Sequence, residues 1–225
     1  YRARRTTTEA FAEWCTIDPP YENFGPHPSH RKGQYVNGAI CPFTAGELAK
    51  GAFENGYEAY GWDILERLTK MVLRDQGRIF FLYHPTTGEP QGRGPSAWGA
   101  AAILSAVDQG LAGIQDQDKQ YRRLRFAPRW AVTPYAEGRY LTGYELSKKK
   151  VDVRWVFTDK GFRYNLESPA EEVAAHLLVP AGKVPSKLLV DGVETIFALN
   201  DVFGSRYVDV NVRPGNGVVD FEVLY

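Results

Sequence analysis

Two loops in this sequence carry polar and aromatic side chains of the kind that contact a ligand. One covers residues 34–43 and the other residues 83–98, and each leads into the first turn of an expected helix. If the two helices point the same way, both loops lie on one face. A neutral sugar binds to aromatic rings through its C–H face and to fixed polar groups through its hydroxyls. The candidate binding residues are Tyr35, Asn37, Gly38, Trp62, Tyr83, His84, Arg93 and Trp98.

Carboxylates near the same loops are the candidates for acid and base chemistry. Glycoside hydrolysis ordinarily uses two carboxyl groups that flank the bond, one protonated and one ionised. The loops and helix starts contain Asp18, Glu22, Glu47 and Glu89. Glu47 lies closest to residues 34–43 and Glu89 lies in the second loop, so these two are the catalytic candidates. Each candidate also has a structural explanation: Glu47 completes a capping box with Thr44, and loop side chains often satisfy loop backbone.

Metal and redox chemistry are not indicated. His27 and His30 lie in a Pro-rich loop, and metal sites need ligands at helix or hairpin spacing, so we expect no metal and no other cofactor. Cys15 and Cys41 match no zinc or redox spacing. We interpret both as small buried apolar residues, and a disulfide between them remains open.

Helical patterns dominate the first half of the chain. Thr6 and Glu9 form a capping box for a short helix that ends by Asp18, and Thr44 caps a second helix that stops at residues 55–56. Apolar residues at helical spacing predict a third helix over residues 58–74, antiparallel to the second. Ser96 caps a further helix, and residues 110–117 close the helical part.

Alternating or apolar runs separated by turn residues dominate the second half. Hairpin signals occur at residues 159–161 and 191–192. Eight strands at this spacing predict an antiparallel β-sandwich and not a parallel sheet. The predicted strands are residues 124–126, 139–141, 151–157, 162–166, 174–179, 187–190, 207–212 and 218–223.

The fold class predicted from these patterns is α+β with two domains. Residues 1–117 form helical hairpins, and residues 118–225 form the β-sandwich. With 225 residues, the chain is long enough for two domains that each bury a core.

The two loop motifs resemble the closing hairpins of the six-hairpin glycosidases. This is the (α/α)6-barrel superfamily, which includes glycogen-debranching glucosidases, α-glycosidases and α-L-rhamnosidases. The similar residues are Tyr35-Val36-Asn37-Gly38-Ala39-Ile40-Cys41-Pro42-Phe43, and then Tyr83-His84-Pro85-Thr86-Thr87-Gly88 before Ser96-Ala97-Trp98. The resemblance implies a sugar-binding cleft bordered by these loops and a C-terminal β-sandwich, as in the C-terminal part of a bacterial enzyme of this kind.

The sequence departs from that superfamily in two ways. A complete toroid has roughly twelve helices, whereas this sequence predicts four or five. We therefore expect the remainder of the barrel in a longer chain or in another chain. Related enzymes often have a base glutamate where this sequence has Phe81, and the resemblance places the partner acid upstream of Tyr1.

Composition favours a neutral partner. Lys plus Arg and Asp plus Glu both number 27, which argues against nucleic acid and against anionic membranes. No run of 18 apolar residues and no signal-peptide pattern occurs. We expect a soluble protein that binds an oligo- or polysaccharide; a periplasmic or secreted location of the full-length protein and a cytoplasmic one both stay open.

The expected function is therefore part of a glycoside hydrolase, incomplete as an isolated chain. The alternatives are a non-catalytic carbohydrate-binding or structural module and a plain interaction domain. If Asn37 is a sugar contact, Asn37→Ala weakens sugar affinity and leaves the fold intact.

Overall fold

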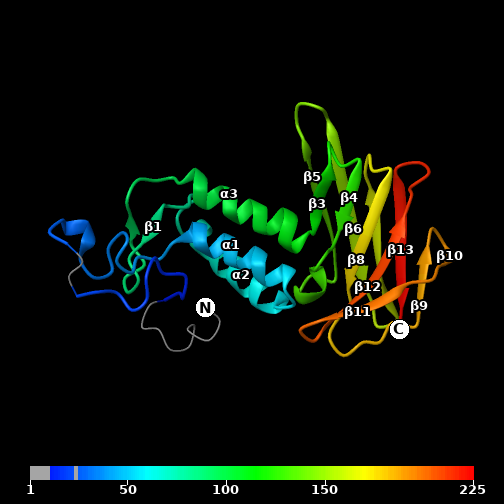
Figure 1. The fold of residues 1–225 in the computed structure, drawn as a ribbon, viewed down its shortest axis with the longest axis horizontal. Coiled ribbons are helices and arrows are strands. Elements are labelled where there is room, and N and C mark those ends of the chain that lie inside the picture. Colours follow the sequence, from blue (N-terminus) through cyan, green and yellow to red (C-terminus); the bar gives the residue numbers. More distant parts are fainter. Residues whose placement is uncertain (1–10, 23–24) are drawn as a thin grey trace. The chain divides into compact units, whose positions relative to one another are not determined.

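The computed structural model describes residues 11–22 and 25–225 and has an α+β fold (Figure 1). The chain divides into two compact units. Unit 1 comprises residues Tyr1–Gly51 and Tyr60–Ala106, and unit 2 comprises Ala52–Ala59 and Val107–Tyr225. The predicted cap at Thr6 lies outside the described residues.

Three α-helices occur in the described residues, and side chains at helical spacing bury one face of each. They are α1 (Pro42–Glu54), α2 (Glu58–Arg74) and α3 (Ala97–Ser105). In α2, Tyr60, Ile64, Leu68 and Met71 are buried, which confirms the predicted helix and its bounds. Ser96 caps α3 as predicted, because its side chain accepts a hydrogen bond from the Gly99 amide.

The start of α1 corrects the predicted capping box. The helix begins at Pro42, and the Ala45 amide donates a hydrogen bond of 3.1 Å to the Cys41 carbonyl. Proline suits the first helical position because its fixed φ is already helical and that position needs no N–H partner. Thr44 and Glu47 therefore lie inside α1, and Glu47 belongs to its second turn.

The backbones of α1 and α3 pack closely against each other at one point. A Cβ at Gly46 would lie 2.5 Å from the carbonyl carbon of Ala102. Only glycine fits at that position, and the small residues of both helices allow this packing.

The segment before the first loop is extended and not helical, which corrects the second half of the predicted N-terminal helix. Cys15 bridges Ile40, the Thr16 amide donates to Ala39, and the Trp14 carbonyl accepts from the Cys41 amide. This tertiary pairing satisfies the backbone of residues 14–16, so local helical propensity is overridden.

A short hairpin follows α2. Strand β1 (Leu82–Tyr83) pairs with β2 (Pro90–Gln91), and Ile40 forms a bridge with Tyr83 on the other side of β1. The hairpin therefore connects the loop of residues 34–43 to the loop that precedes α3.

The helical part ends earlier than predicted. A π-helical turn covers Ala106–Leu111, and β3 (Ile114–Asp118) follows it. Residues 114–117 are thus a strand, because they pair with β4 (Arg123–Phe126).

Unit 2 contains two β-sheets that pack face to face. The six-stranded sheet has the order β10-β9-β13-β7-β6-β5, and the five-stranded sheet has the order β11-β12-β8-β4-β3. The remaining strands are β5 (Glu137–Tyr144), β6 (Lys149–Phe157), β7 (Gly161–Glu167), β8 (Glu172–Leu178), β9 (Lys187–Val190), β10 (Val193–Glu194), β11 (Ala198–Val202), β12 (Ser205–Val212) and β13 (Val218–Leu224).

All eight predicted strands occur in this sandwich, and β3, β10 and β11 are additional. One pair corrects the antiparallel prediction: β4 and β8 are parallel. The chain leaves β4, forms β5, β6 and β7 of the other sheet, and returns as β8 in the same direction as β4. Such a pairing requires a long crossover and leaves no local signal in the sequence.

The core of unit 2 lies between the sheets. Phe126 of β4 contacts Tyr164 of β7 edge to face, with ring centroids 5.6 Å apart, and Phe221 of β13 lies 6.1 Å from Phe126. These three side chains are fully buried. They join the two sheets, because β4 belongs to one and β7 and β13 to the other.

The turn between α1 and α2 belongs to unit 2. Gly56 has φ +77°, and a Cβ there would lie 2.4 Å from the carbonyl oxygen of Val202. Buried Glu58 accepts hydrogen bonds from Ser205, at 2.6 Å, and from Tyr207. The turn is thus fixed to β11 and β12 by both backbone and side-chain contacts.

Two predictions about residue environment can be compared with the described residues. Cys15 and Cys41 are buried thiols, as predicted. In residues 11–22 and 25–225, no helix combines the length and the apolar character that a membrane crossing needs.

Candidate functional site

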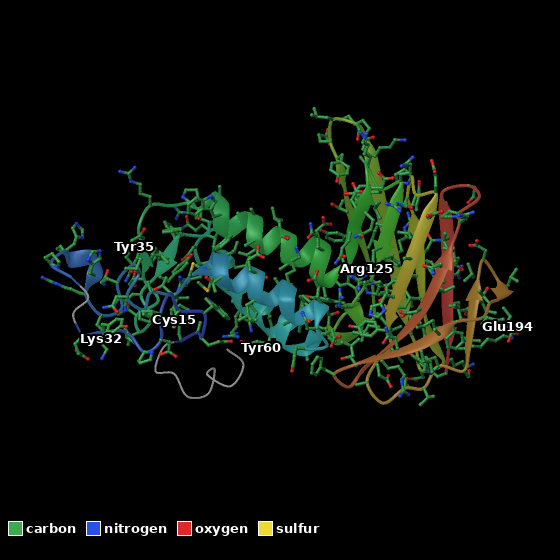
Figure 2. The ribbon with its side chains drawn as sticks, in the orientation of Figure 1. Cys15, Lys32, Tyr35, Tyr60, Arg125 and Glu194 are labelled. Atoms are coloured by element: carbon green, nitrogen blue, oxygen red, sulfur yellow. The ribbon has the colours of Figure 1, made fainter. Side chains whose placement is uncertain are left out.

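Three aromatic side chains meet in unit 1, two from the predicted loops and one from the residue that precedes β1. The Tyr35 ring lies 6.3 Å from the Phe81 ring, and the Phe81 ring lies 5.7 Å from the Trp98 ring in an edge-to-face arrangement. Tyr35 is 44% exposed and Trp98 is 67% exposed. We call these three residues the aromatic edge. Figure 2 labels Tyr35 beside the loops near β1.

Different elements hold each member of the aromatic edge. Tyr35 has φ +38°, and its carbonyl accepts a hydrogen bond of 2.9 Å from the Thr16 hydroxyl. Phe81 directly precedes β1 and packs against a small cluster of Ala39, Cys41 and Leu82. Trp98 is in the first turn of α3, which Ser96 caps. A non-glycine residue at positive φ is uncommon, so the Tyr35 conformation depends on these surrounding contacts.

One buried polar group lies next to this edge. Gln91 of β2 pairs with Leu82 and donates a hydrogen bond of 3.2 Å to the Gly33 carbonyl. Its side-chain oxygen is buried and has no hydrogen-bond partner within the described residues. An acceptor of this kind beside exposed rings suits a ligand hydroxyl.

Asn37 holds the backbone of neighbouring loop residues through three hydrogen bonds. Its side-chain oxygen accepts a hydrogen bond from the Tyr21 amide, and its side-chain nitrogen donates to the carbonyls of Tyr21 and His30, all at 2.8 Å. The residue is fully buried. A sugar contact by Asn37 would therefore require it to leave these three bonds.

Gly38, the next predicted binding residue, is also buried. Its φ is +99°, its amide donates to the Thr16 hydroxyl at 3.0 Å, and a Cβ there would lie 2.9 Å from Pro20. The tight packing explains the glycine without reference to a ligand.

Tyr83 and His84 organise the second loop. The Tyr83 hydroxyl accepts from the Phe80 amide and donates to Asp75 at 2.9 Å, and burial together with Asp75 raises the pKa of Tyr83 to about 12. The His84 ring nitrogen Nδ1 accepts from the amides of Thr86 and Thr87. Both side chains thus satisfy local groups of unit 1.

The other predicted site residues occupy separate places. Trp62 is half-buried in α2, and Arg93 is exposed between β2 and α3. Glu47 is exposed in the second turn of α1, and Glu89 is exposed at the end of the turn that follows β1. Of the predicted binding residues, the structure brings Tyr35 and Trp98 together through Phe81.

A buried charged network in unit 1 carries no signal in the sequence analysis. Arg67 of α2 donates to both oxygens of Glu13 at 2.8 Å and to Asp63 at 2.7 Å, and the Tyr60 hydroxyl donates to Glu13 at 2.5 Å. The Arg67 guanidinium also lies 4.2 Å from the Trp14 ring centroid. Burial alone would raise the pKa of Glu13, but the hydrogen bonds from Arg67 and Tyr60 outweigh it and hold that pKa below 4.5.

Asp108 is a second titratable group that the sequence analysis missed. It lies in the π-helical turn of unit 2, and burial raises the pKa of its carboxyl against the opposing hydrogen bonds of Thr142 and Tyr140. The Tyr140 hydroxyl lies 3.4 Å from the carboxyl. Such a shift occurs at functional sites and in structural networks alike, and the helix-to-strand change at this point is the only sequence signal near it.

In the part of the chain that the structure describes, no three His, Cys, Asp or Glu side chains are grouped so that they could hold a metal ion.

No protein-family model matches the sequence, and no curated protein matches it. A solved α-L-rhamnosidase from Dictyoglumus thermophilum matches over 85% of this chain, with a TM-score of 0.54 and 14% sequence identity. At this identity the likeness is one of fold.

A second solved structure, an α-L-rhamnosidase of Streptomyces avermitilis complexed with L-rhamnose, matches 84% of the chain with a TM-score of 0.49 and 18% identity. The chain spans 21% of the length of the first structure and 18% of the second.

Proposed function

We propose that this chain is the C-terminal part of a six-hairpin glycoside hydrolase that acts on an oligo- or polysaccharide containing a neutral deoxy sugar such as L-rhamnose. Its helical residues would be the end of the barrel domain, and residues 114–225 would be its β-sandwich domain. The observation that carries this proposal is the aromatic edge, where the partly exposed rings of Tyr35 and Trp98, one from each loop, lie on either side of Phe81. The fold likeness to an α-L-rhamnosidase supports it.

The aromatic edge has the chemistry that a deoxy sugar needs. The C–H face and methyl group of such a sugar pack on Tyr35 and Trp98, and its hydroxyls reach polar groups beside the rings. The unpaired side-chain oxygen of Gln91 accepts a hydrogen bond from one sugar hydroxyl, and the exposed Arg93 donates a hydrogen bond to another. Arg93 is thus proposed as a sugar contact.

The outer face of α3 supports the need for further helices. Ala97, Ala101 and Leu104 are exposed and recur at i, i+4 and i+7, so they form one apolar stripe. Leu104 is exposed although it is a large apolar residue. The remaining helices of the barrel, in a longer chain or in another chain, would cover this stripe.

Catalysis would use two carboxyl groups in the assembled barrel. Glu47 and Glu89 stay the candidates within this chain, and the partner acid would come from the remainder of the barrel. A non-catalytic carbohydrate-binding module is the second candidate function. It is favoured by the exposure of both Glu47 and Glu89, because glycosidases commonly hold the general acid in a partly buried pocket.

Binding tests the proposal first. We expect rhamnose-containing oligosaccharides to bind the chain in isothermal titration calorimetry and Trp98→Ala to weaken the affinity about tenfold, because a stacked ring is lost. Phe203→Ala is the matched control, since Phe203 is an exposed aromatic residue of unit 2. Equal affinity of Trp98→Ala and the unchanged chain would contradict the assignment of the aromatic edge.

Turnover separates the two candidate functions. The chain joined to the rest of its barrel would release reducing sugar, and Glu47→Gln would abolish release without changing affinity if Glu47 is catalytic. Binding without release, in the assembled protein and in Glu47→Gln alike, would favour the non-catalytic module.

A further inference from the structure

A recess in unit 2, separate from the aromatic edge, combines aromatic walls with unpaired polar atoms. It has a volume of about 240 Å³ and is lined by Trp130, Tyr135, Phe157, Lys183 and Tyr225, with smaller residues between them. We call it the Trp130 recess. All of its residues belong to the sandwich unit, so its geometry is independent of unit 1.

Ring stacking and a hydrogen bond hold the aromatic lining of the Trp130 recess in place. The indole of Trp130 stacks on that of Trp155, with ring centroids 4.0 Å apart and an interplanar angle of 8°. The Trp155 indole N–H donates to the Tyr135 carbonyl at 3.3 Å, which fixes the backbone of the adjoining wall. Stacked rings held in this way lose little entropy when a ligand packs beside them.

Two polar atoms of the Trp130 recess lack a partner. The indole nitrogen of Trp130 and the hydroxyl of Tyr225 are buried and make no hydrogen bond within the described residues, and Trp130 itself is only 7% exposed. A buried donor without an acceptor is unfavourable, because nothing replaces the hydrogen bond it made to water. Burial raises the pKa of Tyr225 to about 12, so its hydroxyl stays protonated at neutral pH and remains a donor.

The rim of the recess adds a cation and an exposed ring. The Lys183 ammonium lies 5.1 Å from the Tyr225 ring centroid and 3.4 Å from the Asp159 carbonyl. Tyr135 is 54% exposed. The residues that line the recess therefore supply two donors without a partner, a cation and an exposed aromatic ring.

From these contacts we propose that the Trp130 recess binds a single pyranose ring. The hydroxyls of a pyranose accept from the Trp130 indole, the Tyr225 hydroxyl and Lys183, while its C–H face packs on Tyr135. The volume is below the 300–1,000 Å³ of pockets for drug-sized ligands, so it admits one small ring and not an extended chain. In a carbohydrate-active protein this would be a binding site on the sandwich, additional to the aromatic edge.

The test is a nuclear magnetic resonance titration of the whole chain that follows the indole signals. Methyl α-L-rhamnopyranoside, methyl β-D-glucopyranoside and D-galacturonate are added separately up to about 50 mM, since one ring in an open recess is expected to bind with a dissociation constant of about 1–10 mM. We expect the Trp130 indole signal to shift in a saturable way. Stronger binding of galacturonate than of the neutral rings would identify a uronate as the preferred pyranose, because Lys183 would pair with its carboxylate.

Two variants localise the binding. Tyr225→Phe removes only the unpaired hydroxyl, and Tyr135→Ala removes the exposed ring; each is expected to weaken binding about fivefold. Tyr144→Phe is the matched control, because it removes a hydroxyl that pairs with Asp116 elsewhere in unit 2. Thermal unfolding of each variant shows whether it folds like the unchanged chain.

The outcomes are distinct from those of the aromatic edge. Trp98→Ala is expected to leave the Trp130 signal shift unchanged, so a failure of one site does not imply a failure of the other. Absence of a saturable shift with every sugar would overturn the proposal, as would equal binding by the unchanged chain and both recess variants. Equally strong binding of adenosine, a flat ring without a pyranose, would overturn it as well.

Discussion

The two units satisfy their backbone hydrogen bonds in different ways. In the sandwich of unit 2, pairs such as β6 with β7 and β13 with β7 bond main chain to main chain along their length. In the loops of unit 1, side chains supply many of these bonds: Asn37 holds Tyr21 and His30, and His84 holds Thr86 and Thr87. Backbone polar groups need partners in both units; helices and strands supply these partners regularly, whereas loops depend on side chains.

This difference affects whether a polar residue indicates a ligand contact. On the strands of the sandwich, many polar side chains face the solvent beside buried apolar ones, as in the pair Arg163 and Asp220. In the first loop, the polar side chain of Asn37 is buried instead, while the rings of Tyr35 and Trp98 are exposed. A polar loop residue is therefore weaker evidence for a ligand contact than an exposed loop aromatic residue.

The largest effect that tests this comparison is expected at Glu13. Glu13→Gln removes the charge that pairs with Arg67 in a buried site, and a broken buried pair destabilises a protein by about 3 kcal/mol or more. The measurement is urea unfolding followed by far-ultraviolet circular dichroism. The exposed substitution Glu47→Gln is the control and should stay within about 0.5 kcal/mol of the unchanged chain. A Glu13→Gln effect as small as that of Glu47→Gln would contradict the view that buried braces hold unit 1.

A comparable but smaller loss is expected for Asn37→Ala. The substitution removes three hydrogen bonds to loop backbone, so the free energy of unfolding should fall by about 2–3 kcal/mol. The sequence alone predicts weaker sugar affinity and an intact fold for the same substitution. Calorimetric unfolding and a sugar titration of one sample decide between them: unchanged stability with lost affinity would restore Asn37 as a sugar contact.

The third prediction concerns acid. The folded-state pKa of Glu13 lies below 4.5, so its contribution to stability is fully present above the unfolded value and is lost as the pH falls from about 4.5 toward the folded pKa. Between about pH 5 and pH 3, the unchanged chain should therefore lose more stability than Glu13→Gln, which has no carboxyl at this position. Parallel stability curves for the two proteins over this range would show that Glu13 does not titrate in the way its contacts imply.

The smallest effect is expected on the outer face of the sandwich. Arg163→Gln removes an exposed ion pair with Asp220, whose closest hydrogen bond is 2.6 Å, and such pairs contribute less than about 1 kcal/mol. The difference from the unchanged chain should shrink further in high salt, because exposed charges are screened. Urea unfolding in low and high sodium chloride measures both. A loss as large as that of Glu13→Gln would remove the contrast between the two units.

Much of the regular structure was predictable from local patterns. The bounds of α2 follow from its apolar spacing, and the turn at residues 191–192 follows from its Asp-Gly pair, which adopts positive φ at both positions. The missed strands explain the limits. In β3, Gln115, Asp116 and Gln117 give no apolar alternation, and β11 is an edge strand with four exposed residues.

The candidate site was predictable only in part. Tyr35 and Trp98 were identified from the loop motifs, but Phe81 was considered only as a residue unable to accept a proton. Its role is to lie between the other two rings, which is a matter of packing. The Glu13 and Arg67 pair, 54 residues apart, has no sequence signature, because nothing in either local segment specifies the other.

The sequence by itself determined most of the segments of this protein that form helices and strands, because periodicity, caps and turn residues act over a few neighbouring positions. It also marked the two loops that supply the aromatic edge. Only the tertiary structure decided which loop side chains form hydrogen bonds to the backbone and which remain exposed. That choice depends on hydrogen bonds and ring contacts between segments distant in the chain, and each such group can satisfy only the partners that the fold brings within reach.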